Sequence, residues 1–470
     1  MGTRWMRLLA VLAALVLVAV ACGDSDDDSG TSDTTEAGTT GDATTTAAAD
    51  DGTTTTAAVA GTTEAGGEAT GEPAGTIKIG YVTPRTGLLA EFGKADSFVL
   101  DQMREQFADG LQVGDATYEV EIIDRDSESS SQTAANAAQE LILDDEVDLI
   151  LVSSTPDTTI PVAQQCANNE IPCISTMAPW QPHYLGLGGL LPPEEDPPPA
   201  ASEWNYHFFW GLEDIINVYL NIWNEGAPGG TVGALWPDDP DGNAWSDPVV
   251  GFPPAIEAAG FTLVDPGRFP LETNDFTAQI NAFKEAGVTI VSGVLPPPVF
   301  STFWTQAQQQ GFTPEIVTVG KGLLFPGAVA SFDQPNGLTT EVWWTPEHPF
   351  TSSLTGQTAA DLGAAFEEAA GEQWTQPIGF AHALFEVAAD ALARSADPND
   401  PAALIEAIGA TSMDTVVGAV DFSVGPVGGI TKTSVVGGQW VTGGDDPVDL
   451  VIVENANLPE VPTGASLALL

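Results

Sequence analysis

Short apolar runs alternate with helix-like segments along most of this chain, and this alternation limits the possible folds more than any other feature. The first series begins near residue 76, and each apolar run in it is followed by a stretch with helical periodicity. Strands of four to seven residues that alternate with helices predict βαβ units and a parallel sheet. The strands are expected at IKIGYV (77–82), YEVEIID (118–124), DLILVS (148–153) and IPCIST (171–176).

A second series follows a proline-rich segment at 186–200, which we expect to be a surface loop. Two successive series predict an α/β protein with two doubly wound, Rossmann-like lobes and parallel sheets. Ligands bind such sheets outside the carboxyl ends of the strands, so the loops after the strands are the functional candidates. The second set of strands is expected at TVGALW (231–236), FTLVD (261–265), TIVSGV (289–294) and EIVTVG (315–320), followed by helices over 354–370, 377–395 and 401–408 and by the late strands VVGGQWV and DLVIV.

The N-terminal segment predicts export. Residues 1–22 combine Arg4 and Arg7, an apolar run and small residues before a cysteine, which is typical of a secretory signal peptide. The closing AVAC resembles the lipobox of bacterial lipoproteins, which implies lipidation of Cys22; a plain signal peptide with an incidental cysteine is the alternative. Residues 23–75 have too few apolar side chains to offset the entropy of ordering them, so a disordered acidic tether is expected. The predicted location is extracytoplasmic, lipid-anchored to the cell membrane.

The chain is strongly acidic, with 12 Lys and Arg against 66 Asp and Glu and a formal net charge of −54. This balance excludes a nucleic-acid partner, because a phosphate backbone requires a basic patch. A charge of this size keeps a protein soluble at the cost of self-repulsion. A salty habitat would explain this negative charge, but the charge does not identify a ligand.

Catalytic and metal-binding patterns are missing from the sequence. The four histidines show no metal-ligand spacing, and no nucleophile elbow or phosphate-binding loop is present. Cys166 and Cys173, in QQCANNEIPC, form either a disulfide or two buried free thiols. We therefore expect no enzymatic activity, no cofactor and no metal site.

Several segments resemble the type I periplasmic binding proteins, specifically the branched-chain amino acid (Leu/Ile/Val-binding) class of substrate-capturing subunits of ABC importers. The likeness rests on IKIGYVTPRTGLLAEFG, DLILVSSTPDTTIPVAQQCANNEIPCIST, NDFTAQINAFKEAGVTIVSG and TVVGAVDF, whose order and spacing also match. It implies two lobes that close on a ligand about three chain crossings, near 208–212, 338–343 and 426–430. The implied division is an N-terminal lobe of 76–209 plus 342–428, a C-terminal lobe of 210–341 plus 429–456, and a C-terminal tail of 457–470.

The resemblance also implies where the ligand binds in the first lobe. In that family a serine after the third strand holds the ligand carboxylate, and Ser154 matches it, flanked by Ser153 and Thr155. A cap for the following helix is the alternative role of this turn. The loop after the fourth strand, STMAPW, supplies Thr176, Ala178 and Trp180, and has proline where leucine-type members have a threonine.

Lys321 is the largest departure from the family pattern. Amino-acid-binding members have an acidic residue after this second-lobe strand, which pairs with the ligand's ammonium, whereas this chain has the lysine of VGKGL. A cation there would repel an ammonium, so we expect Lys321 to bind an anionic group of the ligand. A structural lysine paired with one of the many acids is the alternative.

Three aromatic residues and an arginine complete the expected site. Trp180, Trp210 and Trp245 lie in or beside segments that face the cleft, where they either stack on the ligand or pack within the protein. Arg85 follows the first strand and either meets an anion or stays solvated. The expected ligand is a small carboxylate or amino-acid-like molecule, and the expected partners are ABC permease and ATPase subunits. The chain is expected to be a monomer; a ligand sensor that reports to a membrane signalling partner is the alternative function.

Overall fold

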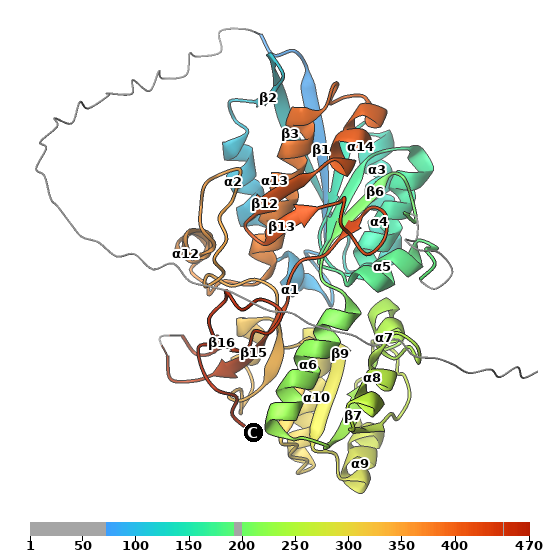
Figure 1. The fold of residues 1–470 in the computed structure, drawn as a ribbon, viewed down its shortest axis with the longest axis vertical. Helices are drawn as coiled ribbons and strands as arrows, with labels where there is room; N and C mark the ends of the chain where they lie inside the picture. Colours follow the sequence, from blue (N-terminus) through green and yellow to red (C-terminus); the bar gives the residue numbers. More distant parts are fainter. Residues whose placement is uncertain (1–71, 192–199, 445) are drawn as a thin grey trace, which may run out of the picture. The chain divides into compact units, whose positions relative to one another are not determined.

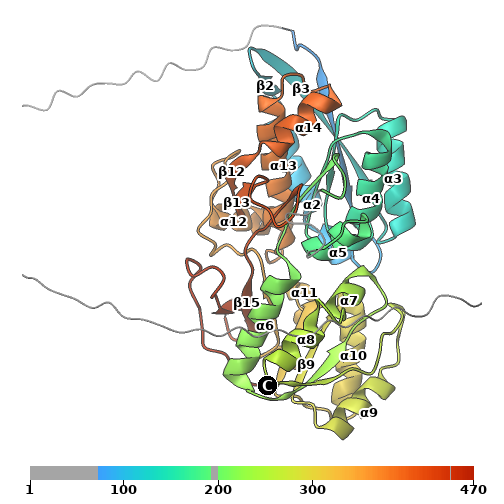
Figure 2. The ribbon, with the colours of Figure 1, turned by 45° about the vertical axis from the view of Figure 1, so that its right-hand side comes forward.

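The computed structural model describes residues 72–191, 200–444 and 446–470. The predicted signal peptide, Cys22 and residues 23–71 lie outside the described residues, as does most of the predicted loop at 186–200. From residue 72 onward the chain forms two lobes, each built on a seven-stranded sheet with helices packed on it (Figures 1 and 2). The predicted α/β class with two doubly wound lobes is confirmed.

The first sheet has the strand order β14-β6-β5-β4-β1-β3-β2. Its neighbouring strands are parallel except β2 and β3, which pair antiparallel at one edge. The inner strands β4 and β5 are buried at every residue, as expected where helices cover both faces of a parallel sheet. The bounds are β1 (Thr76–Thr83), β2 (Leu111–Val113), β3 (Ala116–Asp126), β4 (Leu149–Val152), β5 (Cys173–Thr176), β6 (Asn205–Phe208) and β14 (Ile430–Thr431).

The second sheet has the strand order β16-β15-β11-β10-β9-β7-β8. The strands from β7 to β11 are parallel to their neighbours, and β15 and β16 extend the sheet in antiparallel pairing. The bounds are β7 (Thr231–Leu235), β8 (Thr262–Val264), β9 (Ile290–Leu295), β10 (Ile316–Lys321), β11 (Thr339–Val342), β15 (Val436–Val441) and β16 (Asp449–Glu454). A separate antiparallel pair is formed by β12 (Ser412–Thr415) and β13 (Gly418–Asp421).

Helices cover both sheets, and α13 is the most deeply buried of those described. Nearly all of its residues are inaccessible to solvent, and Phe385 stacks on Tyr81 of β1 with ring centroids 5.7 Å apart. The bounds are α1 (Ala90–Gly93), α2 (Asp96–Gln106), α3 (Ser131–Leu143), α4 (Pro156–Asn169), α5 (Trp180–Gly186), α6 (Leu212–Gly226), α7 (Pro240–Trp245), α8 (Phe252–Ala258), α9 (Thr277–Ala286), α10 (Pro297–Gln309), α11 (Pro326–Val329), α12 (Ala359–Ala370), α13 (Pro377–Arg394) and α14 (Pro401–Gly409).

The chain passes between the lobes three times. The first passage lies between β6 and α6, and the second follows β11, which still pairs within the second sheet. The third lies between β14, which pairs with β6, and β15, which pairs with β11. It therefore falls at 432–435, just after the predicted 426–430, and the first lobe extends to Thr431 instead of 428. A strand of two residues has no apolar periodicity that a sequence could reveal.

Candidate ligand-binding site

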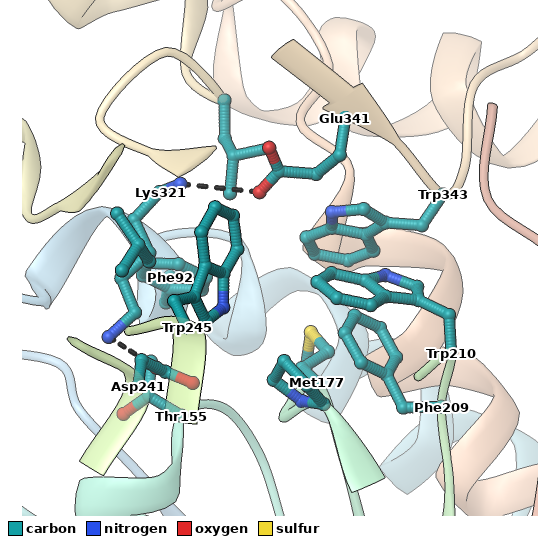
Figure 3. A pocket seen from close by; sticks show the side chains of 13 residues that line it. Phe92, Thr155, Met177, Phe209, Trp210, Asp241, Trp245, Lys321, Glu341 and Trp343 are labelled. Carbon is teal, nitrogen blue, oxygen red and sulfur yellow. Dashed lines mark hydrogen bonds and ion pairs between the residues drawn. The ribbon is translucent and has the colours of Figure 1, made fainter. Parts of the chain in front are cut away.

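A cavity lies where the two lobes meet, with about 340 Å³ of space between its atoms when open solvent is included, and with enclosed room of about 20 Å³, little more than one water molecule needs (Figure 3). Its wall includes the loops that follow β4 and β5 in the first sheet and β7 and β10 in the second, which is where doubly wound sheets place ligands. The lining residues are Phe92, Thr155, Met177, Pro179, Phe209, Trp210, Asp241, Trp245, Val294, Lys321, Leu324, Glu341 and Trp343.

The backbone at these strand ends is unusual. Ser154 and Thr155 after β4, Met177 after β5 and Lys321 at the end of β10 have φ angles of 51°, 62°, 57° and 60°. This left-handed conformation is unfavourable for residues with a side chain, and it concentrates at ligand sites. The amide of Thr155 donates to the carbonyl of Met177 (3.0 Å), which ties the two first-lobe loops together. The sharp turns bring three of these four residues to the cavity wall.

Three tryptophans form the aromatic part of the wall. Trp210 and Trp343 lie on one side of the cavity and Trp245 on the other (Figure 3). Phe209 packs against Trp210 and Trp343, with ring centroids 4.7 Å and 5.3 Å apart, and Trp245 stacks on Phe252 at 4.8 Å. The indole Nε1 of each of these tryptophans is buried and has no hydrogen-bond partner among the described residues.

The amino group of Lys321 points to carboxylates of its own lobe. Its Nζ lies 2.5 Å from Asp241 Oδ2 and 3.5 Å from Asp239 Oδ2, and these side chains are 7%, 1% and 2% exposed. Asp239 also caps α7, because its Oδ1 accepts from the amide of Gly242 (2.6 Å). Lys321 is thus on the cavity wall as predicted, but the structure favours the alternative role, a lysine paired with acids.

Burial and charge pairing shift the pKa values of this cluster. Burial alone would lower the pKa of Lys321, but attraction by Asp241, Asp239 and Asp157 outweighs it and raises that pKa above its ordinary value. Burial raises the pKa of Asp241 to about 6 although Lys321 opposes the shift. Burial likewise raises the pKa of Asp157, again against Lys321. The lysine therefore stays charged at neutral pH.

Glu341 is a second acidic group on the cavity wall, held by neutral donors. Its Oε2 accepts from the hydroxyls of Tyr219 (2.7 Å) and Thr340 (2.9 Å), and its Oε1 accepts from the amide of Lys321 (3.2 Å). Burial raises its pKa, opposed mainly by the Tyr219 bond. Gly320 makes room for this group, since a Cβ there would lie 2.9 Å from Trp245 Cη2 and 3.3 Å from Glu341 Oε1.

The structure brings four of the predicted residues to the cavity, namely Thr155, Trp210, Trp245 and Lys321. Ser153 and Ser154 are fully buried next to Thr155 but do not line it. Thr176 donates its hydroxyl to the carbonyl of Phe208 (2.6 Å). The carbonyl of Ala178 accepts from His207 Nε2 (2.8 Å). Both bonds hold the loop after β5 in place, so these two residues support the wall from behind.

Two predicted contacts are not supported by the structure. Trp180 packs edge-on against Tyr184, with centroids 6.0 Å apart, and its Nε1 donates to Glu213 (3.4 Å). Arg85 pairs with Asp124 on the neighbouring strand β3. Neither residue lines the cavity. Trp180 takes the packing role that stood as its alternative, whereas Arg85 forms an ion pair within its lobe, which neither of its two expected roles included.

Cys166 and Cys173 do not form a disulfide in the structure. Both are free thiols, fully buried between α4 and β5. Burial raises the pKa of the Cys166 thiol, and the neighbouring Cys173 adds to the shift. A thiol held neutral in this way is a poor nucleophile, so the pair acts as part of the apolar core.

Sequence reasoning missed the acids of the cavity and much of its apolar wall. Asp241 follows β7 and Glu341 lies in β11, far along the chain from Lys321. The stretch DDPDGNAW after the strand at 231–236 was a usable signal, because the carboxyl ends of parallel strands meet at one edge of a sheet. Phe92, Met177, Phe209 and Trp343 carry no such signal, since apolar residues are equally common in cores.

A family model described as periplasmic binding protein matches residues 76–445. The chain belongs to this family. A search of curated proteins found no match. Members of the family are extracytoplasmic solute-binding proteins, a fold generally without enzymatic activity.

Many solved structures share the fold. A leucine-binding protein from Thermotoga maritima has 19% identity and a TM-score of 0.65, with 81% of this chain and 99% of that chain covered. A solute-binding protein of an ABC transporter from Rhodopseudomonas palustris, in complex with 3,4-dihydroxybenzoic acid, has 18% identity, a TM-score of 0.65, and 83% and 99% coverage. A branched-chain amino acid transporter protein from Streptococcus pneumoniae, in complex with isoleucine, has 16% identity, a TM-score of 0.61, and 80% and 99% coverage.

Proposed function

We propose that this chain is the solute-binding subunit of an ABC importer, which captures a small organic solute between its lobes and delivers it to a membrane permease. The observation that carries the proposal is the cavity at the carboxyl ends of strands from both sheets, lined by three tryptophans and by the polar side chains of Thr155, Asp241, Lys321 and Glu341. A site formed by both lobes couples binding to their relative motion, because the bound molecule contacts each of them.

The similar solved structures support an importer role, since several are named as ABC transporter proteins. Isoleucine and hydroxylated benzoic acids are ligands of those proteins. For this chain we propose only that it belongs to the leucine- and isoleucine-type class of binding subunits, without transferring a ligand. Among the described residues no helix is long and apolar enough to cross a membrane. We propose, from the AVAC motif, that Cys22 is lipidated and attaches the protein to the cell membrane, with the following segment as its tether.

Uptake measurements test the importer role. Cells that lack this protein should lose high-affinity uptake of one solute, and the same purified solute should bind the protein and raise its melting temperature. Restoring the protein should restore uptake. A solute that binds tightly while its uptake is unaffected by the deletion would reject delivery to a permease and leave sensing as the role.

A further inference from the structure

The charges around the cavity are unbalanced. Among the described residues that line it, Lys321 is the one cation, and its charge is shared by Asp239 and Asp241. Glu341 also lines the cavity, and Asp157 interacts electrostatically with both Lys321 and Asp239. No ion pair to Glu341 or Asp157 is formed by the described residues. The surroundings of the cavity therefore hold more carboxylates than cations.

Among the described residues that line the cavity, no cation is free to pair with an anionic ligand. Arg85 pairs with Asp124 away from the cavity wall, and the Lys321 amino group faces Asp241 (Figure 3). The turn at Thr155, predicted to hold a carboxylate, leads directly into α4, whose first turn contains Asp157. A carboxylate bound at this turn would be repelled by Asp157 and by the acids across the cavity.

We propose that the cavity binds a ligand of net positive charge, whose cationic nitrogen lies between the carboxylate of Glu341 and the faces of the tryptophans, with Asp157 outside the lining adding to the attraction. This inference rests on the proposed solute-binding function and narrows its ligand to amines and quaternary ammonium compounds. Aromatic faces attract cations, most strongly those of tryptophan in a desolvated site.

Trp245 and Glu341 lie close together beside Gly320 (Figure 3), which lets one cation interact with both. The edge of Trp245 and the Glu341 carboxylate both approach Gly320, at 2.9 Å and 3.3 Å from the position of a Cβ there. The Nε1 donors of Trp210, Trp245 and Trp343 and the hydroxyl of Thr155 are buried without partners. These donors suit a neutral oxygen of the ligand, such as a hydroxyl or a carbonyl.

Cation binding should be linked to proton release. Burial raises the pKa of Glu341 and of Asp157, and it raises the pKa of Asp241 to about 6, so Asp241 is partly protonated near that pH. The other groups that face these acids are Lys321, Asp239 and the hydroxyls of Tyr219 and Thr340. A bound cation favours the ionised acids and expels protons, whereas a bound anion favours the protonated acids and takes protons up.

The test is calorimetry at pH 6 on the purified protein, in two buffers with different ionisation enthalpies, which reports the protons exchanged. One matched set is tyramine, tyrosine and 3-(4-hydroxyphenyl)propionate, and the other is 3-methylbutylamine, leucine and 4-methylpentanoate. Within each set the apolar body is similar and the charge changes from positive to zwitterionic to negative. At least one amine should bind at least ten times more tightly than its matched acid, with proton release and an affinity that rises with pH.

Two substitutions test where the cationic nitrogen of the ligand binds. Glu341→Gln keeps the shape and a carbonyl acceptor, and Asp157→Asn does the same at a less buried position. Removing the charge-assisted contact of Glu341 should weaken amine binding about 10- to 100-fold. Removing the charge of Asp157, which does not line the cavity, should weaken it less. Glu257→Gln, on the exposed face of α8, makes the same change in net charge and should leave affinity unchanged. Melting curves show whether each variant is folded.

Several outcomes would overturn the inference. They are tighter binding of the acids than of the amines, proton uptake on amine binding, or unchanged amine affinity in both acidic-site variants. Failure of all six compounds to bind would also reject it, while a wider solute screen that finds a neutral or anionic ligand would leave the solute-binding function standing. A wide screen without any ligand would reject that function itself.

Discussion

Replacing Lys321 by methionine should strongly destabilise the protein, because the lysine is the cation of a buried charge cluster. Its side chain is 7% exposed, and those of Asp239 and Asp241 are 2% and 1% exposed. Removing one partner of a buried pair leaves an uncompensated charge and costs about 3–5 kcal/mol. Methionine preserves most of the apolar stem, so the loss reports the charge more than the packing. The free energy of unfolding at pH 8 should therefore fall by that amount.

The loss should shrink in acid. Asp241 has a pKa raised to about 6 in the folded protein, above its unfolded value, so its protonated form favours folding. That contribution is present below the unfolded pKa and is lost as pH rises through the folded pKa. Without Lys321 this folded pKa rises further, so the variant should be close to wild type at pH 4 and increasingly weaker towards pH 8. Adding Asp241→Asn should recover part of the loss, since it removes one of the stranded charges.

Urea denaturation at pH 4, 6 and 8 measures both effects. Lys94→Met is the matched control, because Lys94 also pairs with an acid, Glu372, but the two side chains are 39% and 52% exposed. An exposed pair of this kind contributes about 0–1 kcal/mol. A Lys321→Met variant that loses no more than the control at pH 8, or whose loss does not depend on pH, would refute a structural role for the lysine.

Three further predictions concern the anchor, the motion and the arginine. Cys22→Ala should release the protein from membranes, seen by fractionation, without changing its melting temperature; a variant that stays membrane-bound would reveal another anchor. Ligand should shift the lobes towards a closed form and reduce the radius of gyration in small-angle scattering, and an identical profile at saturation would indicate a rigid site. Arg85→Ala should leave ligand affinity unchanged, because the side chain pairs with Asp124 outside the cavity wall. A large loss of affinity in a calorimetric titration would show that the arginine does contact the ligand.

The two lobes could be predicted because the strands that build them appear as local apolar runs in the sequence. The apolar runs at 77–82 and 148–153 match β1 and β4 closely, since the central strands of a parallel sheet are buried on both faces and read as continuous apolar segments. The third passage between the lobes lies a few residues later than predicted, because β14 still belongs to the first sheet although only two of its residues pair with β6. A strand that short is defined by its neighbour and not by its own side chains.

The sequence predicted individual loops of the site, but not how side chains from different loops pair with one another. Thr155 and Lys321 were found because each follows an apparent strand. The role of Lys321 depended on Asp239 and Asp241, which lie about eighty residues earlier and reach the lysine because β7, β9 and β10 are neighbours in the sheet. Predicting that pairing required the strand order, which the sequence does not state. The same holds for Glu341, an acid within a buried strand that pairs with Tyr219 of α6.

Capture of a solute between the lobes is tested most directly by calorimetric titration of the purified protein with the solute that a screen identifies. We predict one solute bound per chain and, in Trp245→Ala, a loss of affinity of at least about tenfold, because the ring would bury apolar surface against the ligand. Trp180→Phe, a substitution outside the cavity wall, should bind as wild type does. Equal affinity in wild type and Trp245→Ala would place the ligand elsewhere and contradict the central claim.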